Sequence, residues 1–490
     1  MIKLSFSQKS ACGFKYILDK TEPYSAPGKN ALKKAEFFAP DKKAELLTEL
    51  ENVERLKKAV ACRSKEVSRL ESVFFHLKDL HNTFARLSHT TLDEVELFEL
   101  KAFLRLVRQA AEIAANLSAE YGLEDFVFRN TDEAFDLLKA DKGEGFFVED
   151  GLSDKLFAAR RDKEAANAAL ARAENEERLA AAKQAHLEAA AREEAALEEA
   201  RAKLCSLLRP FAEDFSYNSS LAGRLDLTLA KARLAYATNA VKPSVSGDKL
   251  RLKELTNPET AEKLGLRGAA FTPVSIEAER GVTLITGANM GGKSVALKTV
   301  ALNVLLALAG FFVYASEATV PLFGFVEILN ENMQSVDRGL STFGGEIVRL
   351  NSVMQKLKSG EYGLCLMDEF AGGTNFEEGS RIFRAAERAL NEMNGIFILT
   401  THFDGVSADA NALYQVKGLS GADLASLDRE IECGADGAEL VAQYMDYGLV
   451  KVEDKTKGVP KDAVAVCKLL RLDSDAVSYT HLRAHETRHD

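Results

Sequence analysis

The sequence predicts a multidomain chain: an N-terminal all-helical half with long Ala- and Glu-rich helices, followed by an α/β domain built on a parallel sheet. Residues 152–209 contain no Gly or Pro and are dense in Ala, Glu, Arg and Lys, which are strong helix formers. In the C-terminal half, continuous apolar runs at 282–286, 363–367 and 396–401 are typical of buried parallel strands. A glycine-rich run follows the first of these strands and precedes a long apolar helix.

The N-terminal half carries the spacing of amphipathic helices. Between residues 40 and 138, apolar side chains recur three and four positions apart, which places them on one face of a helix. Leu46, Leu50 and Val53 begin this pattern, and Leu100 and Leu104 continue it. We therefore expect a helical core domain over residues 1–245.

Within this domain, residues 152–209 predict long lever-like or clamp-like helices. There are 19 Ala among residues 158–202, while large apolar residues are sparse. Because no strict heptad is sustained, we expect a folded-back antiparallel pair with thin packing. Residues 151–210 hold 11 basic and 11 acidic residues. Their alternation is typical of a solvated face, whereas a pair that grips DNA should carry an excess of Lys and Arg.

Residues 287–294 form a phosphate-binding pattern, G-x-x-x-x-G-K-[ST], between the strand 282–286 and the helix 295–308. In such a loop, backbone N–H groups and the helix N-terminus face the phosphates. Lys in this position contacts the β- and γ-phosphates, and the following hydroxyl ligates Mg²⁺. The predicted nucleotide-binding residues are Gly287, Ala288, Asn289, Met290, Gly291, Gly292, Lys293 and Ser294.

Two further strands end in residues with catalytic chemistry. The run 363–367 is followed by Asp368 and Glu369, so that Asp368 can hold Mg²⁺ and Glu369 can act as general base on water. The run 396–401 is followed by His402, which we interpret as a sensor of the γ-phosphate, although a lone His is more often a satisfied core or surface residue. Lys293, Glu369 and His402 are the predicted catalytic residues.

Together these motifs resemble those of the MutS ATPases. Residues 340–346 are similar to the S-T-F-x-x-E segment of that family, residues 368–375 to its D-E-x-x-x-G-T stretch, and Thr401-His402 to its T-H switch. The resemblance covers about residues 250–420, and residues 225–243 resemble the end of the MutS helical core. It implies an ABC/MutS-like P-loop NTPase domain over residues 246–420. Residues 421–473 are expected to complete this domain at its C-terminal end.

The resemblance also implies the activity and the assembly. MutS ATPases hydrolyse ATP with Mg²⁺ and work as dimers with composite sites. Ser341 and Thr342 would then reach the γ-phosphate bound by the partner subunit. We expect a homodimer on this ground.

The chain departs from the mismatch-repair form in several places. Ala288 stands where MutS proteins have Pro, and Gly372-Gly373 lacks their Arg, as in the shorter second-type MutS proteins. We find no N-terminal mismatch-reading module and expect no nuclease domain after residue 475. Mismatch recognition by this chain alone is therefore not expected.

A closer resemblance is to the KamC-type MutS-related proteins, through residues 284–293, 331–336, 445–447 and 459–463. It implies an ATPase subunit that, with a second reactivase subunit, reactivates an adenosylcobalamin-dependent lysine 5,6-aminomutase. Two alternatives stay open. One is a DNA-binding MutS relative that acts on mismatched or branched DNA. The other is a structural coiled-coil protein with a nucleotide-gated conformation, against which Glu369 argues.

Composition restricts the setting. The net charge is −11 and the six Cys form no C-x-x-C pair, which suits free thiols in a reducing cytosol and predicts no metal–thiolate site. The N-terminus lacks the apolar core of a signal peptide and no membrane span is apparent, so we expect a cytoplasmic protein. Residues 474–490, with His481, His485 and His489, are expected to be a disordered, non-native tail.

Overall fold

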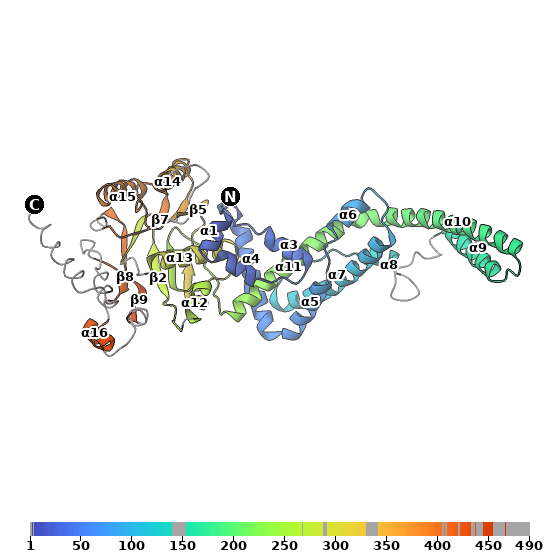
Figure 1. Ribbon diagram of the computed structural model, residues 1–490, viewed down its shortest axis with the longest axis horizontal. Helices are drawn as coiled ribbons and strands as arrows, with labels where there is room; N and C mark the ends of the chain where they lie inside the picture. Colours follow the sequence, from blue (N-terminus) through green and yellow to red (C-terminus); the bar gives the residue numbers. More distant parts are fainter. Residues whose placement is uncertain are drawn as a thin grey trace, which may run out of the picture. The chain divides into compact units, whose positions relative to one another are not determined.

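The computed structural model describes residues 2, 4–139, 153–266, 268–287, 292–329, 342–403, 406, 409–419, 422–432, 437, 444–453 and 466. The chain divides into two compact units (Figure 1). Unit 1 consists of residues 1–21, 35–54 and 231–490, and unit 2 consists of residues 22–34 and 55–230. Neither unit is contiguous in sequence. The ranges 1–245, 246–420 and 421–473 stay predictions.

Tertiary contacts explain why N-terminal residues group with the C-terminal sheet. The side chain of Gln8 is buried, and its Nε2 donates a hydrogen bond of 3.2 Å to the carbonyl oxygen of Ile328. Asn257 Nδ2 donates to the carbonyl oxygen of Cys12 at 3.3 Å. Periodicity within a single segment carries no information about such distant partners.

Unit 2 contains only helices among its described elements. They are α3 (Ala26–Lys33), α5 (Ser64–His76), α6 (His81–Leu87), α7 (Glu94–Tyr121), α8 (Asp132–Leu137), α9 (Asp154–Ala171), α10 (Glu176–Leu208) and parts of α4 (Lys43–Cys62) and α11 (Ala212–Ala237), with the 3-10 turn η3 (Arg209–Phe211). The predicted amphipathic pattern is confirmed in α7, whose buried face includes Leu100 and Leu104. A capping box of Asp93 and Glu96 begins this helix, and Gly122, with φ +74°, ends it.

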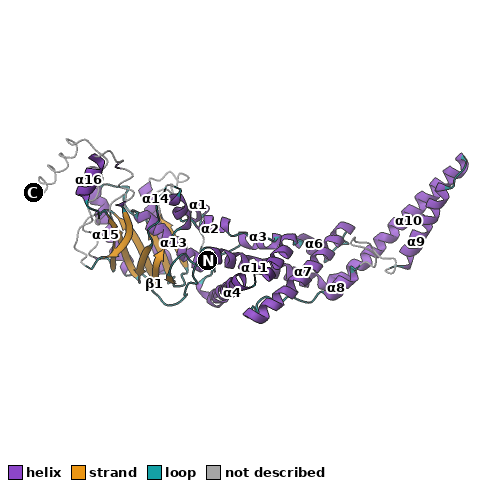
Figure 2. Ribbon diagram, turned by 90° about the horizontal axis from the view of Figure 1, so that it is seen from below, coloured by secondary structure: helices purple, strands orange, loops and turns teal. Residues whose placement is uncertain are grey.

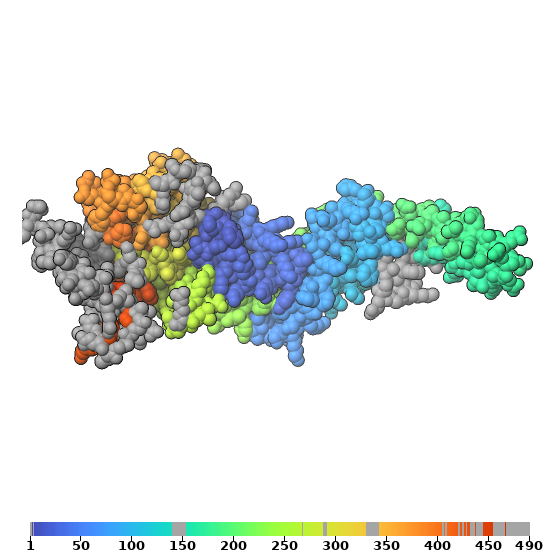
Figure 3. Space-filling model, viewed as in Figure 1, coloured from blue at the N-terminus to red at the C-terminus, as the bar shows by residue number. Residues whose placement is uncertain are grey.

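The folded-back pair predicted within residues 152–209 is also confirmed, as α9 and α10 (Figure 1). The same residues are the green atoms of Figure 3. The ion pairs Lys155–Glu199, at 2.9 Å, and Arg192–Asp162, at 3.6 Å, show that the two helices are antiparallel. The break comes at Asn175, whose side chain caps α10 by accepting from the N–H of Arg178. The apolar contact is thin: it consists of Leu156, Ala159, Ala196, Leu197 and Ala200.

Unit 1 is built on a six-stranded sheet with the order β5-β6-β7-β3-β8-β9. All neighbouring strands are parallel except β9, which runs antiparallel to β8. The strands are β3 (Gly281–Thr286), β5 (Phe325–Leu329), β6 (Gly363–Met367), β7 (Gly395–Thr401), β8 (Ala412–Gly418) and β9 (Asp446–Lys451). The three predicted buried strands correspond to β3, β6 and β7, in which every residue is buried.

Helices cover both faces of this sheet (Figures 1 and 2). Since strand side chains alternate between faces, Leu284, Met367 and Leu399 lie together on one of them, packed with residues of α14 (Thr342–Lys358) and α15 (Phe376–Asn391). The helix predicted over 295–308 is α13 (Lys293–Leu308), which begins two residues earlier and lies on the opposite face.

The remaining elements of unit 1 flank the sheet. They are α1 (Phe6–Ala11), α2 (Phe14–Lys20), η1 (Pro40–Lys42), α12 (Pro258–Gly265), α16 (Leu424–Glu432), and the antiparallel sheet β2-β1-β4 of β1 (Leu250–Leu255), β2 (Val274–Ala278) and β4 (Glu317–Thr319). No helix in the described part of the chain is long and apolar enough to cross a membrane. The tail 474–490 lies outside the described residues.

Candidate functional site

The topology brings the predicted site residues to one edge of the sheet. β6, β7 and β3 are neighbours and parallel, so their carboxyl ends lie side by side. Asp368 follows β6, His402 follows β7 and Gly287 follows β3. In open parallel sheets this edge, next to the central strands, is where ligands bind.

Two glycines frame the loop between β3 and α13. Gly287 has φ +147° and Gly292 has φ +78°, values that a residue with a Cβ rarely adopts. A Cβ on Gly292 would also lie 2.7 Å from Cδ1 of Tyr447. The predicted residues Ala288, Asn289, Met290 and Gly291 lie outside the described residues.

Lys293, the first residue of α13, is a buried cation. Its side chain is 2% exposed, and its Nζ lies 2.9 Å from the carbonyl oxygen of Gly287 and 3.6 Å from Oε1 of Glu369. Burial lowers the pKa of Lys293. The nearby carboxylates of Glu369 and Asp368 raise it, but by less than burial lowers it. Glu369 is the ion-pair partner of this buried ammonium group, and the position in the first turn of a helix, at the carboxyl edge of the sheet, suits an anionic ligand.

The carboxylate of Asp368 and the backbone of Glu369 are both bonded by a residue that sequence reasoning missed. Thr400, in β7, is fully buried, and its hydroxyl donates to Oδ1 of Asp368 at 2.8 Å while accepting from the N–H of Glu369 at 2.8 Å. Glu369 and Ala371 both have positive φ, +51° and +63°, which is strained for non-glycine residues. The available signal was a polar residue inside an apolar run, directly before Thr401-His402.

α14 contacts the same turn. Oε2 of Glu346 accepts a hydrogen bond of 3.1 Å from the N–H of Ala371. Glu346 belongs to the S-T-F-x-x-E segment, for which sequence reasoning assigned a role only to Ser341 and Thr342. Ser341 lies outside the described residues, and Thr342 is the first residue of α14, although its side chain is not described.

His402 is placed at this edge with one ring nitrogen available. Its Nδ1 is buried and has no hydrogen-bond partner among the described residues, and its ring contacts that of Phe403 at 4.8 Å between centroids. Buried polar atoms in proteins are nearly always paired. A nitrogen without a described partner at the carboxyl edge of the sheet therefore marks His402 as a residue to test for a role in ligand binding.

A cavity of about 310 Å³ adjoins the N-terminus of α13. Besides residues 292–296 it is lined by Thr260 and Leu264 of α12, by Phe271, Thr272 and Val274, and by Tyr447 of β9. Its volume and mixed apolar lining suit a small organic ligand. Sequence reasoning found neither Phe271 nor Tyr447, because nothing in their local sequence connects them with the glycine loop.

The two predicted metal ligands, Ser294 and Asp368, offer a metal ion only a hydroxyl and a carboxylate. Ser294 lies in the first turn of α13, and Asp368 already accepts the hydroxyl of Thr400. The described residues contain no group of three or more His, Cys, Asp or Glu that could hold a metal by themselves. Such a set fits Mg²⁺, which keeps waters and takes ligand phosphates in nucleotide sites.

The fold defines unit 1 as an open α/β domain, with Lys293, Asp368 and His402 at the carboxyl edge of its central strands. Residues 283–469 of the chain match the family model of MutS domain V. The domain-level resemblance to MutS proteins that the motifs indicated is therefore supported over this segment.

Curated relatives match the same part of the chain. Endonuclease MutS2 of Thermomicrobium roseum is 39% identical over 197 residues, which are 36% of this chain and 24% of that protein. Endonuclease MutS2 of Carboxydothermus hydrogenoformans is 34% identical over 202 residues, covering 41% and 25%. That of Thermus thermophilus is 33% identical over 221 residues, covering 45% and 27%. The matches thus span about a quarter of each relative, and they give no support to the KamC-type assignment.

Proposed function

We propose that this chain is a MutS-type ATPase that binds ATP with Mg²⁺ and hydrolyses it at the carboxyl edge of β6, β7 and β3. The observation that carries the proposal is the position of Lys293. Its ammonium group is buried, with a lowered pKa, between a backbone carbonyl and Glu369. A triphosphate at this edge would place its β- and γ-phosphates beside this ammonium group and the N-terminus of α13, which is the contact that the lysine of a phosphate-binding loop makes.

The surrounding residues suit the roles predicted for them. Lys293 would neutralise charge on the β- and γ-phosphates, and Ser294 and Asp368 would hold Mg²⁺. Glu369 would accept a proton from the attacking water, and His402 would contact the γ-phosphate. ATP itself supplies the phosphoanhydride bond that is broken.

We further propose that the cavity beside α13 takes the nucleoside part of ATP. Phe271 and Tyr447 both line it, and aromatic rings stack well on a purine.

We propose that the ATPase domain covers residues 246–420 and that residues 421–473 complete it. The pairing of β9 with β8 supports including the later range, because β9 extends the same sheet.

For the partner, we infer that nucleic acid has the better support. The curated relatives are named endonucleases, which act on nucleic acid, whereas the aminomutase-reactivase reading depends on motif resemblance alone. We therefore propose a DNA-related MutS ATPase, probed with branched and mismatched duplexes. A homodimer with composite sites, in which Ser341 and Thr342 act on the partner's nucleotide, is part of the same proposal.

One observation favours a protein client as the second candidate. On the α9–α10 pair, Lys155, Lys163 and Arg192 are engaged in ion pairs with carboxylates of the facing helix. Cations already paired in this way are poorly available for DNA phosphates. A client protein, such as the aminomutase of the reactivase reading, would meet a neutral surface here.

The first experiment tests the ATPase with Glu369→Gln. We expect this variant to bind a fluorescent ATP analogue as the wild type does and to lose turnover by at least about a hundredfold, since the general base is gone. A labelled nucleotide is needed because the chain has no Trp. Lys293→Ala is the matched variant that should lose binding. Undiminished hydrolysis by Glu369→Gln would remove Glu369 from the proposed role.

The second experiment separates the partners. Branched duplex DNA should raise the ATPase rate several-fold, and rising salt should abolish the stimulation because phosphate contacts are salt-dependent. Purified lysine 5,6-aminomutase is added in a parallel reaction. Stimulation by the aminomutase and not by DNA would replace the DNA proposal with the client-protein candidate.

A further inference from the structure

α5 and α7 of unit 2 run antiparallel and leave a groove at one end. Arg63 pairs with Glu120 at 2.7 Å near one end of the helix pair, and Lys78 pairs with Glu99 at 2.8 Å near the other. Beside the second ion pair lies a cavity of about 470 Å³, which we call the α5–α7 groove. Its apolar lining consists of Leu80, Phe98, Ala102, Phe103 and Leu106.

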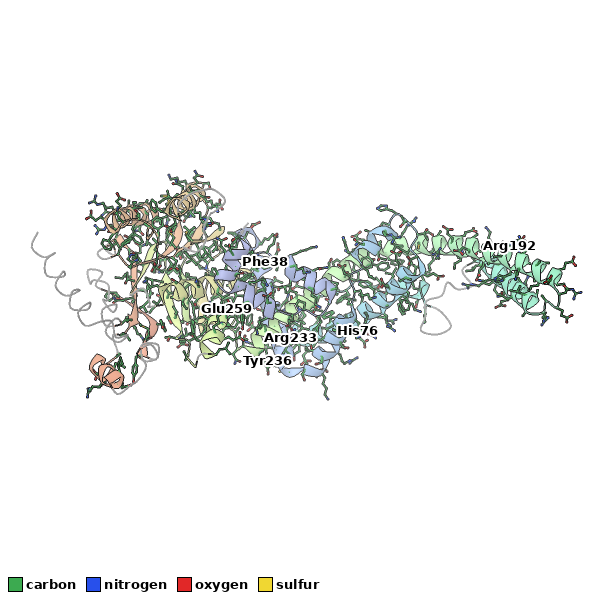
Figure 4. The ribbon with its side chains drawn as sticks, in the orientation of Figure 1. Phe38, His76, Arg192, Arg233, Tyr236 and Glu259 are labelled. Atoms are coloured by element: carbon green, nitrogen blue, oxygen red, sulfur yellow. The ribbon has the colours of Figure 1, made fainter. Side chains whose placement is uncertain are left out.

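Large apolar side chains stand exposed at this groove. Phe98, in its wall, is 46% exposed, and Val95, one turn earlier in α7, is 67% exposed. Phe75 is 69% exposed and its ring contacts that of His76, which also lines the groove (Figure 4, where His76 is labelled). Clusters of exposed apolar side chains of this kind mark protein interaction sites more often than single exposed residues do.

Among the described residues, Arg105 is the cation of the groove that stays unpaired, whereas Lys78 and Glu99 pair with each other. Arg69 and Lys65 lie seven and eleven positions before His76, on the same exposed face of α5, and neither pairs with a carboxylate in the described part of the chain. By contrast, Arg63, Arg86 and Arg129 of the same unit are all ion-paired.

We propose that the α5–α7 groove binds an acidic amphipathic helix of a partner protein. One bulky apolar side chain of that helix inserts between Phe98 and Phe103, and a carboxylate pairs with Arg105. The cavity volume suits such an anchor, and a groove beside two packed helices is a common seat for a third. The guanidinium of Arg105, unpaired among the described residues, makes a carboxylate on the partner helix complementary to the groove.

A nucleic-acid strand suits the groove less well than a helix does. The floor is aliphatic and aromatic, with Leu80 and Phe103 buried, and Glu99 lies among the lining residues. A phosphate backbone has no apolar side chain to fill this aliphatic and aromatic lining, whereas an amphipathic helix has one. The inference does not depend on the proposed ATPase activity, because all of its residues lie in unit 2.

The test uses the full chain and a fluorescein-labelled helical peptide of about five turns. The peptide carries Leu and Phe at helical spacing with Glu on both flanks, and a control peptide has every Glu replaced by Lys. We expect the acidic peptide to bind, with anisotropy reporting a Kd of about 10 μM. Phe98→Ser and Arg105→Glu should each weaken binding about tenfold.

Matched variants keep this test specific. Phe157→Ser, at an aromatic residue 53% exposed on α9, and Arg178→Glu, on α10, should leave binding within about twofold. Arg105→Glu should in turn bind the Lys peptide better than the wild type does. Both Phe98 and Arg105 are exposed, so circular dichroism melting should find all variants folded.

Several results would overturn the proposal. One is equal binding of the Glu and Lys peptides to the wild type, and another is unchanged binding by both groove variants. Oligo-dT binding that falls in Phe98→Ser and Arg105→Glu would assign the groove to nucleic acid. A dimer in sedimentation equilibrium that Phe98→Ser dissociates would assign it to a second copy of this chain.

Discussion

Thr400 and Thr283 are buried threonines on the neighbouring strands β7 and β3, yet their hydroxyls have opposite surroundings. Thr400 Oγ1 bonds both Asp368 Oδ1 and the N–H of Glu369. Thr283 Oγ1 has no hydrogen-bond partner among the described residues. A buried polar atom without a partner costs free energy. The Thr400 hydroxyl therefore stabilises the end of β7, whereas the Thr283 hydroxyl lowers the stability of β3.

This contrast predicts opposite effects of one substitution. Thr400→Val should lower the turnover rate about 10- to 100-fold and weaken the dependence on Mg²⁺, because Asp368 loses the donor that orients it. Thr283→Val should leave turnover unchanged and be neutral or stabilising by about 1 kcal/mol. Steady-state hydrolysis across a Mg²⁺ titration, together with thermal unfolding, measures both. Equal activity of the two variants would show that Thr400 does not position the site.

At the scale of elements, the crossing of α3 and α11 in unit 2 depends on glycine. A Cβ on Gly223 would lie 2.8 Å from the carbonyl carbon of Pro27, closer than packed atoms approach. Next to this crossing, Asp226 is buried and accepts from both the N–H and the hydroxyl of Ser25, at 2.7 and 2.6 Å. The short separation of the two helices brings these groups within hydrogen-bond distance.

Gly223→Ala should therefore destabilise unit 2 by about 1–3 kcal/mol, the usual cost of overpacking. The control is Gly265→Ala at the end of α12, where an added Cβ meets no atom within 4 Å. It should be neutral or stabilise by about 0.4–1 kcal/mol. Hydrogen exchange resolved by segment is the measurement, because the two units need not unfold together. Protection of α3 and α11 that survives Gly223→Ala would contradict this account of the crossing.

At the scale of the whole molecule, the proposed composite site predicts that two inactive variants restore activity when they are mixed. A Ser341→Ala chain keeps Glu369 but lacks the group acting in trans, and a Glu369→Gln chain has the reverse defect. Mixed in equal amounts, they should recover roughly a quarter of the wild-type rate, since half of the dimers are mixed and each holds one complete site. Turnover of the mixture against each variant alone is the measurement. No recovery under conditions where subunits exchange would exclude sites shared between two copies.

Much of the fold could be predicted because its signals are local. The all-buried strands β3, β6 and β7 appear as continuous apolar runs, and α13 follows the glycine loop directly. The pair α9–α10 could be predicted from its composition, but its break could not be located. The turn uses neither Gly nor Pro, and Asn175 acts only as a cap.

Sequence alone therefore determined β3, β6 and β7, the residues that follow them, the helix α13 and the helical character of residues 154–208. Propensity, periodicity and motif spacing are properties of neighbouring residues, and these features depend on nothing else. Only the tertiary structure decided that Thr400 holds Asp368, that Tyr447 packs on Gly292, and that the N-terminal helices belong with the sheet. Such contacts join segments far apart in the chain, and their free energy depends on burial and geometry that exist only after folding.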